Sequence, residues 1–226
     1  MATRTGAPAL RRRPQLSEDV ADHVRGLIMS GEIRPGDFVR LDETAADLGV
    51  SVTPVREALL TLRGEGMVEL VPHRGYKVSP LSRDDVRDIF WLQGVIAVEL
   101  AGRAARVITA EDIDQLERFG NGLRSAVQRR DVGEIEHYEF EFHRHLNVVA
   151  GAGKLAWFLH NAVRYTPHRL YAADLTWGEL AVDCHDRLIT ALRTGDFAQV
   201  TEQTRRQFDD GADRLTKHLD SAGIWV

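Results

Sequence analysis

Apolar side chains recur at helical spacing near the start of the chain. In residues 16–31, "LSEDVADHVRGLIMSG", they fall on one face of a helix that we expect to start at Ser17 and to stop at Gly31. Ser17 is a good cap, and acidic residues follow it in the first turn. The next stretch, "EIRPGDFVRL", predicts a Pro-Gly turn and a short extended piece.

The same pattern predicts two further helices separated by a tight turn. One covers about residues 42–48, and the other begins at Ser51 or Thr53 with Pro54 in its first turn, where a missing amide hydrogen costs little. Its predicted buried face consists of Val55, Leu59, Leu60 and Leu62. Residues 67–78, "MVELVPHRGYKV", then predict a strand, a turn and a second strand.

Helix, helix, turn, helix and hairpin follow one another in the order of a winged helix-turn-helix. In that fold the third helix enters the major groove of DNA with its first turn facing the bases, and the hairpin, or wing, lies against the backbone or an adjacent groove. The candidate base-reading residues are Ser51, Val52, Thr53 and Arg56. The candidate wing contacts are His73, Arg74, Gly75 and Lys77.

After Leu81 the pattern becomes helical throughout. Ser82 caps a long helix, and strand signals are almost absent from the remainder. Further helices are predicted at about 110–130, 133–150, 154–172, 176–194 and 196–222. The fold class is therefore mainly α. We expect a basic arm over 1–16, a winged helix-turn-helix with a small β-hairpin over 17–81, and an all-α bundle over 82–226.

The charge distribution permits a nucleic-acid partner despite the overall net charge of −5. Residues 1–82 carry 11 basic and 11 acidic side chains, whereas residues 83–226 carry 18 and 23, so the acidity belongs to the C-terminal part. Arg11, Arg12 and Arg13 in the arm would add attraction for phosphates.

The same composition bears on the compartment. No stretch is long and apolar enough to span a membrane, and the N-terminus lacks the apolar core of a secretory signal. The single cysteine, Cys184, cannot form an internal disulfide. We expect a cytoplasmic protein with no membrane partner.

Several motifs resemble a known family of regulators. "TPVREAL" after "LGVS", followed by "RGEGMVELVPHRGYKV", resembles the DNA-binding domain of the GntR family of transcription regulators. "EFEFH" at 139–143 and "CHDRLITALRTGD" at 184–196 resemble the FCD ligand-binding domain of its FadR subfamily. The resemblance covers residues 17–220. It implies a homodimer that binds a short inverted repeat of double-stranded DNA under the control of a small-molecule effector.

The resemblance also implies a ligand set in the helical domain. The family carries Asp and three His, and the matching residues here are Glu139, His143, His185 and Gln207. Glu139 and His143 lie one helical turn apart, so they can grip a single ion. Two imidazoles and a carboxylate can hold one divalent metal per chain, Zn²⁺, Ni²⁺ or Mn²⁺, although the neutral Gln207 is a poor fourth ligand. A second departure is Val52, where the family commonly has a base-reading arginine.

An alternative reading needs no metal. The same residues could form a hydrogen-bonded polar patch that binds an organic effector directly. The predicted effector-binding residues are Glu139, His143, Arg164 and His185. An effector carboxylate could meet Arg164, and we expect the effector to be an organic acid or a similar metabolite.

Three classes of function remain open at this point. We expect a sequence-specific DNA-binding regulator, acting as a repressor. The alternative is a metal-dependent enzyme acting on a small carboxylate in the helical domain, since a metal with an open position is also a catalytic centre. No further residue stands out as a base or nucleophile, so we predict no enzyme. A third possibility is a winged helix that binds another protein instead of DNA.

Overall fold

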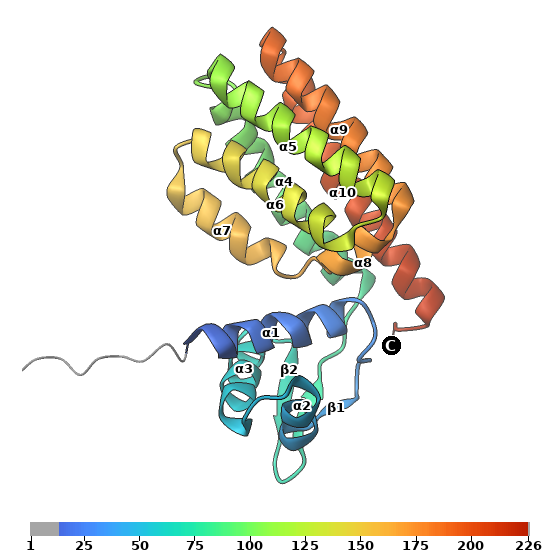
Figure 1. Cartoon of the computed structure of the whole chain (residues 1–226). Coiled ribbons are helices and arrows are strands. Elements are labelled where there is room, and N and C mark those ends of the chain that lie inside the picture. Colours follow the sequence, from blue (N-terminus) through green and yellow to red (C-terminus); the bar gives the residue numbers. More distant parts are fainter. Residues whose placement is uncertain (1–13, 226) are drawn as a thin grey trace, which may run out of the picture.

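The computed structural model describes residues 14–225, which form a small winged domain beneath a helical bundle (Figure 1). The N-terminal elements are α1 (Pro14–Met29), β1 (Phe38–Val39), α2 (Leu41–Leu48), α3 (Val52–Gly64), β2 (Val68–Val71) and β3 (Gly75–Val78). The bundle consists of α4 (Arg83–Ala104), α5 (Ala110–Arg129), α6 (Val132–Val149), α7 (Gly153–Val163), α8 (His168–Ala173), α9 (Leu175–Thr194) and α10 (Phe197–Ala222).

The first helix begins earlier than its sequence suggests. It starts at Pro14, so Ser17 lies inside α1 and does not cap it. Proline is well suited to the first position of a helix, where its missing amide hydrogen has no partner to lose. The predicted arm of residues 1–16, with Arg11, Arg12 and Arg13, lies outside the described residues except for the start of α1.

The turn between α2 and α3 follows directly from local sequence. Gly49 ends α2 in the left-handed conformation, with φ of 64°, which glycine adopts without steric cost. Ser51 is the N-cap residue of α3, as one of the two predicted alternatives has it. The buried face of α3 consists of Pro54, Val55, Ala58, Leu59 and Leu62. Leu60 was wrongly placed on that face; its side chain is half exposed.

The wing belongs to a three-stranded antiparallel sheet in the order β1-β3-β2. The short extended piece after the Pro-Gly turn is β1, which pairs with β3, so the predicted hairpin has a third strand along its other edge. At the wing tip His73 and Gly75 adopt positive φ values of 61° and 102°. This backbone supports the predicted turn, and it needs a glycine at the second of these positions.

Reciprocal capping defines the start of two bundle helices. At the start of α4 the Ser82 side chain accepts from the Asp85 amide, and the Asp85 side chain accepts from the Ser82 amide. Thr109 and Asp112 form the same pair of bonds at the start of α5. The central helix α4 packs against α10 and α7, while α5 packs against α6 and α9. Within residues 14–225 no helix combines the length and apolar character that a membrane crossing requires.

The predicted helix over 154–172 is wrong, because it is two helices. α7 ends at Val163, and α8 begins at His168 after a tight connection in which the Tyr165 amide donates to the Ala162 carbonyl. Pro167 explains the break: it has no amide hydrogen to donate, and it disfavours helical geometry at the residue before it. The connection places Arg164 and Tyr165 against the winged domain.

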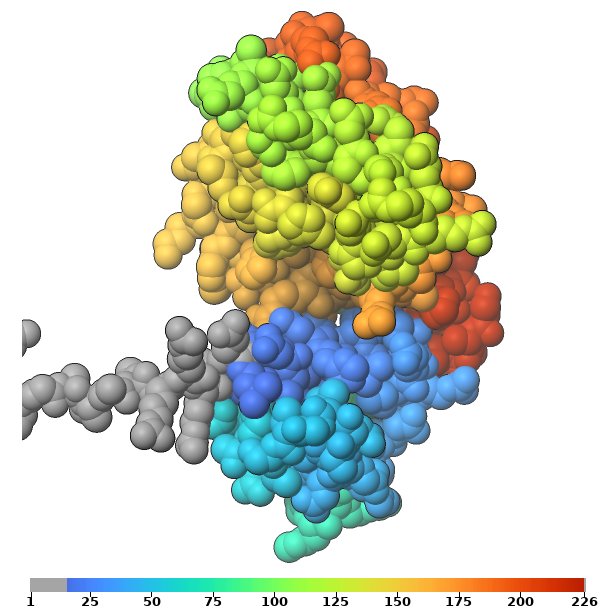
Figure 2. Space-filling model, viewed as in Figure 1, coloured from blue at the N-terminus to red at the C-terminus, as the bar shows by residue number. Residues whose placement is uncertain are grey.

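The two domains are in contact through α1. Figure 1 shows α1 lying between the bundle above and α3 below, and Figure 2 shows the wing tip projecting at the end of the molecule farthest from the bundle. The His218 ring donates to the Ser30 carbonyl at 3.0 Å. A Cβ at Gly31 would meet the Ile224 side chain at 3.0 Å, so the end of α1 and the chain after α10 approach closely.

Candidate functional site

The first turn of α3 presents a mixed surface to solvent. Ser51, Thr53 and Arg56 are exposed. Ser51 makes no side-chain capping bond, so its hydroxyl is available to a partner. Val52, predicted as a base-reading residue, is partly buried and packs against the hydrophobic core. Only part of its side chain can therefore touch a base.

Arg56 is the cation of this turn, and its side chain is exposed. Among residues 14–225, no hydrogen bond or ion pair engages its guanidinium, and the neighbouring Glu57 does not pair with it. An unpaired arginine at the start of a helix can make a bidentate contact with guanine without first breaking an intramolecular bond. This arrangement favours the base-reading role over the alternative of a surface ion pair.

The wing cations have weak internal partners. The Arg74 guanidinium lies 4.6 Å from the centre of the Phe38 ring, and Lys77 Nζ lies 2.7 Å from Glu69 Oε1 on the neighbouring strand. Exposed pairs of this kind contribute only about 0–1 kcal/mol. A phosphate can therefore compete for both side chains. His73 is exposed at the tip, and Gly75 provides the turn geometry.

In the bundle, the four residues predicted as a ligand set lie together, and we call them the polar cluster: Glu139, His143, His185 and Gln207. Glu139 and His143 come from α6, His185 from α9 and Gln207 from α10. Glu139 Oε1 and Oε2 lie 3.5 Å from His185 Nε2 and His143 Nε2 respectively. Gln207 Nε2 lies 3.1 Å from His143 Nε2 and 3.3 Å from Glu139 Oε2.

Two members of the polar cluster have unused polar atoms. Glu139 Oε1 and both ring nitrogens of His185 are buried without a hydrogen-bond partner within the described part of the chain. Buried polar atoms are normally satisfied, so atoms left over in a cluster point to a missing ligand or water. Burial lowers the pKa of His185 to about 4, against the opposing effect of Glu139. The ring is therefore neutral at pH 7, which is the form that binds metals.

The donor set fits a divalent transition metal with three ligands. One donor atom from each of Glu139, His143 and His185 lies within 4.8 Å of the others. Imidazole nitrogen and carboxylate oxygen suit Zn²⁺, Ni²⁺ and Mn²⁺. Gln207 turns its NH₂ group toward Glu139 and His143, so its amide would have to rotate to offer oxygen.

Arg164 is not at the polar cluster. It follows the last residue of α7, where its Nε donates to Asp22 Oδ1 of α1 at 2.8 Å, and in the described residues its polar contacts are with α1 alone. The sequence-based assignment of Arg164 to the effector site is therefore not supported by this placement, since the break at Pro167 carries it to the domain junction. A cleft of about 400 Å³ between α5 and α9, lined by Arg124, Gln128 and Glu179, does not include the polar cluster either.

Two family models match the chain. One, described as "Bacterial regulatory proteins, gntR family", matches residues 16–78, from the first turn of α1 to the end of β3. The other is the FCD domain, which matches residues 88–210 and contains the whole polar cluster. The chain belongs to the GntR family and carries an FCD domain.

Curated relatives of this GntR-family chain are transcription regulators. HTH-type transcriptional regulator YdfH of Escherichia coli O6:H1 is 30% identical over 148 residues, covering 66% of this chain and 64% of that protein. HTH-type transcriptional repressor RspR of Escherichia coli K12 is 32% identical over 125 residues, covering 55% and 54%. The alignments thus span between half and two thirds of these relatives. The metal-dependent enzyme kept as an alternative finds no support among them.

The fold itself has a solved counterpart. The structure of E. coli McbR/YncC superimposes with a TM-score of 0.70 at 20% identity, over 89% of this GntR-family chain and 97% of that one. The predicted fold class, a winged helix-turn-helix followed by an all-α domain, is confirmed.

Sequence reasoning missed two neighbours of the polar cluster in the FCD domain. Phe142 stacks on His185 with ring centroids 3.7 Å apart. Gln203 is buried on α10, and its Oε1 has no partner among the described residues. The spacing could have identified Gln203, which lies one turn before Gln207 and so on the same helix face. For Phe142, beside His143, the sequence contains no signal because its partner is on another helix.

Proposed function

We propose that this GntR-family protein is a repressor that binds an inverted-repeat operator as a homodimer and whose DNA affinity depends on a small molecule bound at the polar cluster. The observation that carries the proposal is the set of unused buried atoms on Glu139 and His185 inside the FCD domain. The family supplies the DNA partner, and these atoms supply a place for a ligand.

Base reading is assigned to Ser51, Thr53 and Arg56, with Val52 contributing the exposed part of its side chain. Arg74 and Lys77 of the wing, with the tip residues His73 and Gly75, contact the phosphate backbone. Base contacts specify the sequence and phosphate contacts position the domain, so the two groups differ in their effect on specificity. The wing projects at the end of the molecule farthest from the bundle in Figure 2, and α3 lies on the side of α1 away from the bundle in Figure 1.

At the polar cluster, Glu139, His143 and His185 would hold one divalent metal ion. When bound, such an ion supplies positive charge to which the carboxylate of a small organic acid can bind. The protein's own contribution is a neutral His185 ring, a buried carboxylate and the Gln207 amide, which holds Glu139 and His143 in place by hydrogen bonds. Without a metal, the same atoms bind an organic ligand by hydrogen bonds.

Dimer formation through the bundle is supported by exposed aromatic side chains. Trp91 on α4 is 67% exposed and Trp157 on α7 is 57% exposed. Neither belongs to the core. Exposed tryptophans are costly in water and frequent at interfaces, so we assign both to the dimer interface. Two-fold symmetry of the dimer then demands a matching palindrome in the operator.

Elemental analysis and native mass spectrometry of the purified protein test the ligand assignment. We expect one metal per chain in the wild type and loss of that metal in His143→Ala and His185→Ala. His145→Ala is the matched control, because His145 faces Asp112 at 3.2 Å and lies outside the polar cluster. A wild type that stays metal-free after incubation with Zn²⁺, Ni²⁺ or Mn²⁺ would rule out the metal and leave the organic ligand.

Selection of operator DNA from random sequence, followed by binding measurements, tests the DNA assignment. Arg56→Ala should weaken operator binding by about 1–3 kcal/mol. Arg63→Ala, on the same helix but in its last turn, should have a much smaller effect. If the wild type selects no sequence, the winged domain binds a protein instead of DNA.

A further inference from the structure

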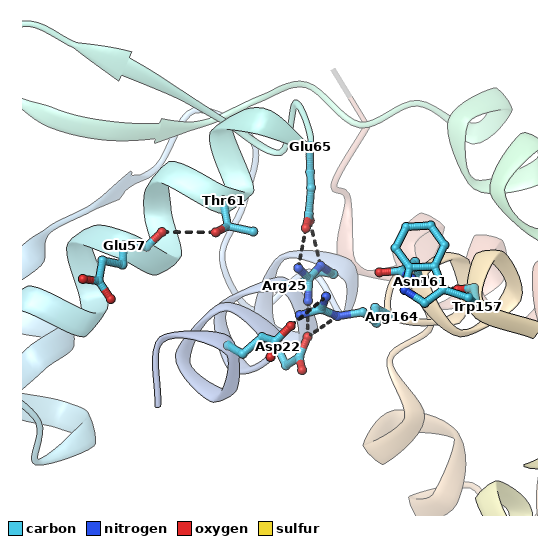
Figure 3. Close-up of polar contacts among 9 residues, drawn as sticks. Asp22, Arg25, Glu57, Thr61, Glu65, Trp157, Asn161 and Arg164 are labelled. Carbon is cyan, nitrogen blue, oxygen red and sulfur yellow. Dashed lines mark hydrogen bonds and ion pairs between the residues drawn. The ribbon is translucent and has the colours of Figure 1, made fainter. Parts of the chain in front are cut away.

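A chain of ion pairs joins the bundle to the end of α3 (Figure 3). Its centre is Arg25 on α1, whose side chain is fully buried. Arg25 donates to both carboxylate oxygens of Glu65, from Nη2 at 2.7 Å and from Nε at 2.9 Å, and it also pairs with Asp22. Glu65 is the C-cap residue of α3, directly after Gly64, so Arg25 links the helix proposed to read DNA to α1.

Arg164 is the residue of the bundle that takes part in this series of ion pairs. Its Nε donates to Asp22 Oδ1, the same oxygen that pairs with Arg25. The next residue, Tyr165, places its ring 5.8 Å from the Arg25 guanidinium. Burial and then the nearby charge of Glu65 raise the pKa of the Tyr165 hydroxyl. Two consecutive residues of one short connection therefore contact the buried arginine or its partners.

That connection is held by a residue of the bundle core. Gln93 on α4 is fully buried, and its Nε2 donates to the Ala162 carbonyl at 2.8 Å. Its Oε1 accepts from the Thr166 hydroxyl at 3.3 Å. Gln93 thus hydrogen-bonds to both ends of residues 162–166 and ties the segment that carries Arg164 and Tyr165 to α4.

The same connection lies close to the polar cluster. α8 packs against α6, which carries Glu139 and His143. His168, the first residue of α8, donates to the Val163 carbonyl at 3.0 Å. Burial lowers the pKa of its ring, and the charges of Glu139 and Asp22 oppose that change. Through α8, the connection therefore adjoins the helix that carries two members of the polar cluster.

One hydrogen-bond donor at the junction between the two domains has no acceptor within the described residues. Arg164 Nη2 is buried and has no hydrogen-bond partner within residues 14–225. A buried guanidinium with an unused donor gains by a shift that brings an acceptor into reach. A different pairing of Arg164 that supplied this acceptor would recover the missing hydrogen bond.

We infer that residues 162–168 are the coupling element through which the polar cluster controls α3, by way of Arg164, Asp22, Arg25 and Glu65. The inference deepens the proposed function, since it rests on a ligand acting at the cluster. Ligand binding that moves α6 relative to α8 shifts the connection. The shift changes how Asp22 is shared between Arg164 and Arg25. The contact between the C-terminal end of α3 and α1 changes as a result. The coupling is tested by the response of α3 to a change at the polar cluster.

Hydrogen–deuterium exchange on the full-length protein measures that response without a known operator. The cluster is perturbed in two ways, by Zn²⁺ against EDTA and by His143→Ala, and exchange is followed at the amides of residues 57–66. In the wild type we expect at least one perturbation to change these rates by about fivefold or more, the lower end of typical coupling between sites. In Arg164→Gln the same perturbation should leave them nearly unchanged.

Two controls make the result specific. Arg169→Gln alters an arginine of α8 that interacts with Glu136 and takes no part in the series of ion pairs from Arg164 to Glu65. The α3 amides of this variant should therefore respond like those of the wild type. Circular dichroism establishes that Arg164→Gln is folded. An α3 that responds equally with and without Arg164, or that responds to neither perturbation in the wild type, overturns the inference. Metal content and operator binding, measured separately, show whether the proposed function survives that result.

Discussion

The rings of Phe142 and His185 lie stacked, with centroids 3.7 Å apart and an interplanar angle of 4°. Phe142 is fully buried on α6, so its flat face restricts the rotation of the His185 ring on α9. This contact keeps His185 Nε2 directed at Glu139 Oε1. An aromatic side chain of the core thus sets the orientation of a polar residue in the ligand site.

Substitution of Phe142 separates its two roles. Phe142→Ala should destabilise the protein by about 3–5 kcal/mol, because it leaves a cavity in the core. Phe142→Leu keeps most of the volume and should cost less than about 1.5 kcal/mol. It removes the flat face, however, and we expect about tenfold weaker Zn²⁺ binding. Isothermal titration calorimetry measures this, with Phe119→Leu as the control: its ring neighbours His145, outside the polar cluster. Equal Zn²⁺ affinity in both leucine variants would contradict the orienting role.

Acid should destabilise the metal-free protein through His185. Burial lowers the pKa of this ring from 6.5 to about 4. The unfolded chain therefore binds a proton between these pH values that the folded chain does not, and stability rises with pH across that window. The contribution, on the order of 3 kcal/mol, is complete above about pH 6.5 and disappears as pH falls toward 4.

Urea unfolding between pH 4 and 7 in EDTA tests this pH dependence. The free energy of unfolding should rise less steeply with pH in His185→Gln than in the wild type. His23→Gln, which changes an exposed histidine on α1, should leave the slope unaltered. Parallel curves for the wild type and His185→Gln would show that the ring does not titrate in this window.

Loss of Arg25 should be among the costlier single changes in the winged domain. Arg25→Ala leaves Glu65 and Asp22 without their buried partner, and removal of one member of a buried ion pair typically costs about 3–5 kcal/mol. Arg40→Ala is the matched control, because its pair with Glu43 is exposed on both sides and contributes about 0–1 kcal/mol. Chemical denaturation measures the free energy of unfolding of both variants. Similar small decreases in the two would show that the Arg25 ion pairs contribute little to stability.

Close packing of α10 on α4 requires a glycine at position 211. A Cβ there would lie 2.7 Å from Cε1 of Phe90, and the Gly211 carbonyl accepts from the Tyr171 hydroxyl at 2.6 Å. We expect Gly211→Ala to lower the free energy of unfolding by about 1–3 kcal/mol through overpacking. Gly102→Ala in α4 meets no atom within 4 Å and should stabilise by about 0.5–1 kcal/mol. Thermal unfolding compares the two, and opposite signs are the expected outcome.

The wing should contribute salt-dependent affinity with little specificity. Arg74→Ala and Lys77→Ala should each reduce the slope of log affinity against log salt by about one, uniformly across DNA sequences. Arg87→Ala, an exposed arginine of α4 paired with Asp84, should leave the slope unchanged. Fluorescence anisotropy over a range of salt concentrations gives the slopes. A sequence-dependent loss in Lys77→Ala would instead indicate that the wing reads bases.

Much of the fold was determined by the sequence alone, because local signals act through neighbouring residues. Ser82 and Asp85 cap α4 reciprocally, and Gly49 ends α2 in a conformation that other residues avoid. The polar cluster was also predictable, since one turn of α6 separates Glu139 from His143 and the family resemblance supplied His185 and Gln207. Apolar periodicity was less reliable at boundaries, where the helix over 154–172 broke at Pro167 and α1 began before Ser17.

What only the tertiary structure decided is which distant residues meet. Nothing near Arg164 in the sequence indicates that it pairs with Asp22, 142 residues earlier, and the hairpin pattern does not reveal that β1 completes the sheet. The burial of Arg25 and the stacking of Phe142 on His185 likewise depend on elements packed from elsewhere in the chain. A side chain's environment is set by the helices that close over it, and its spacing along the chain specifies a face but not the partner of that face.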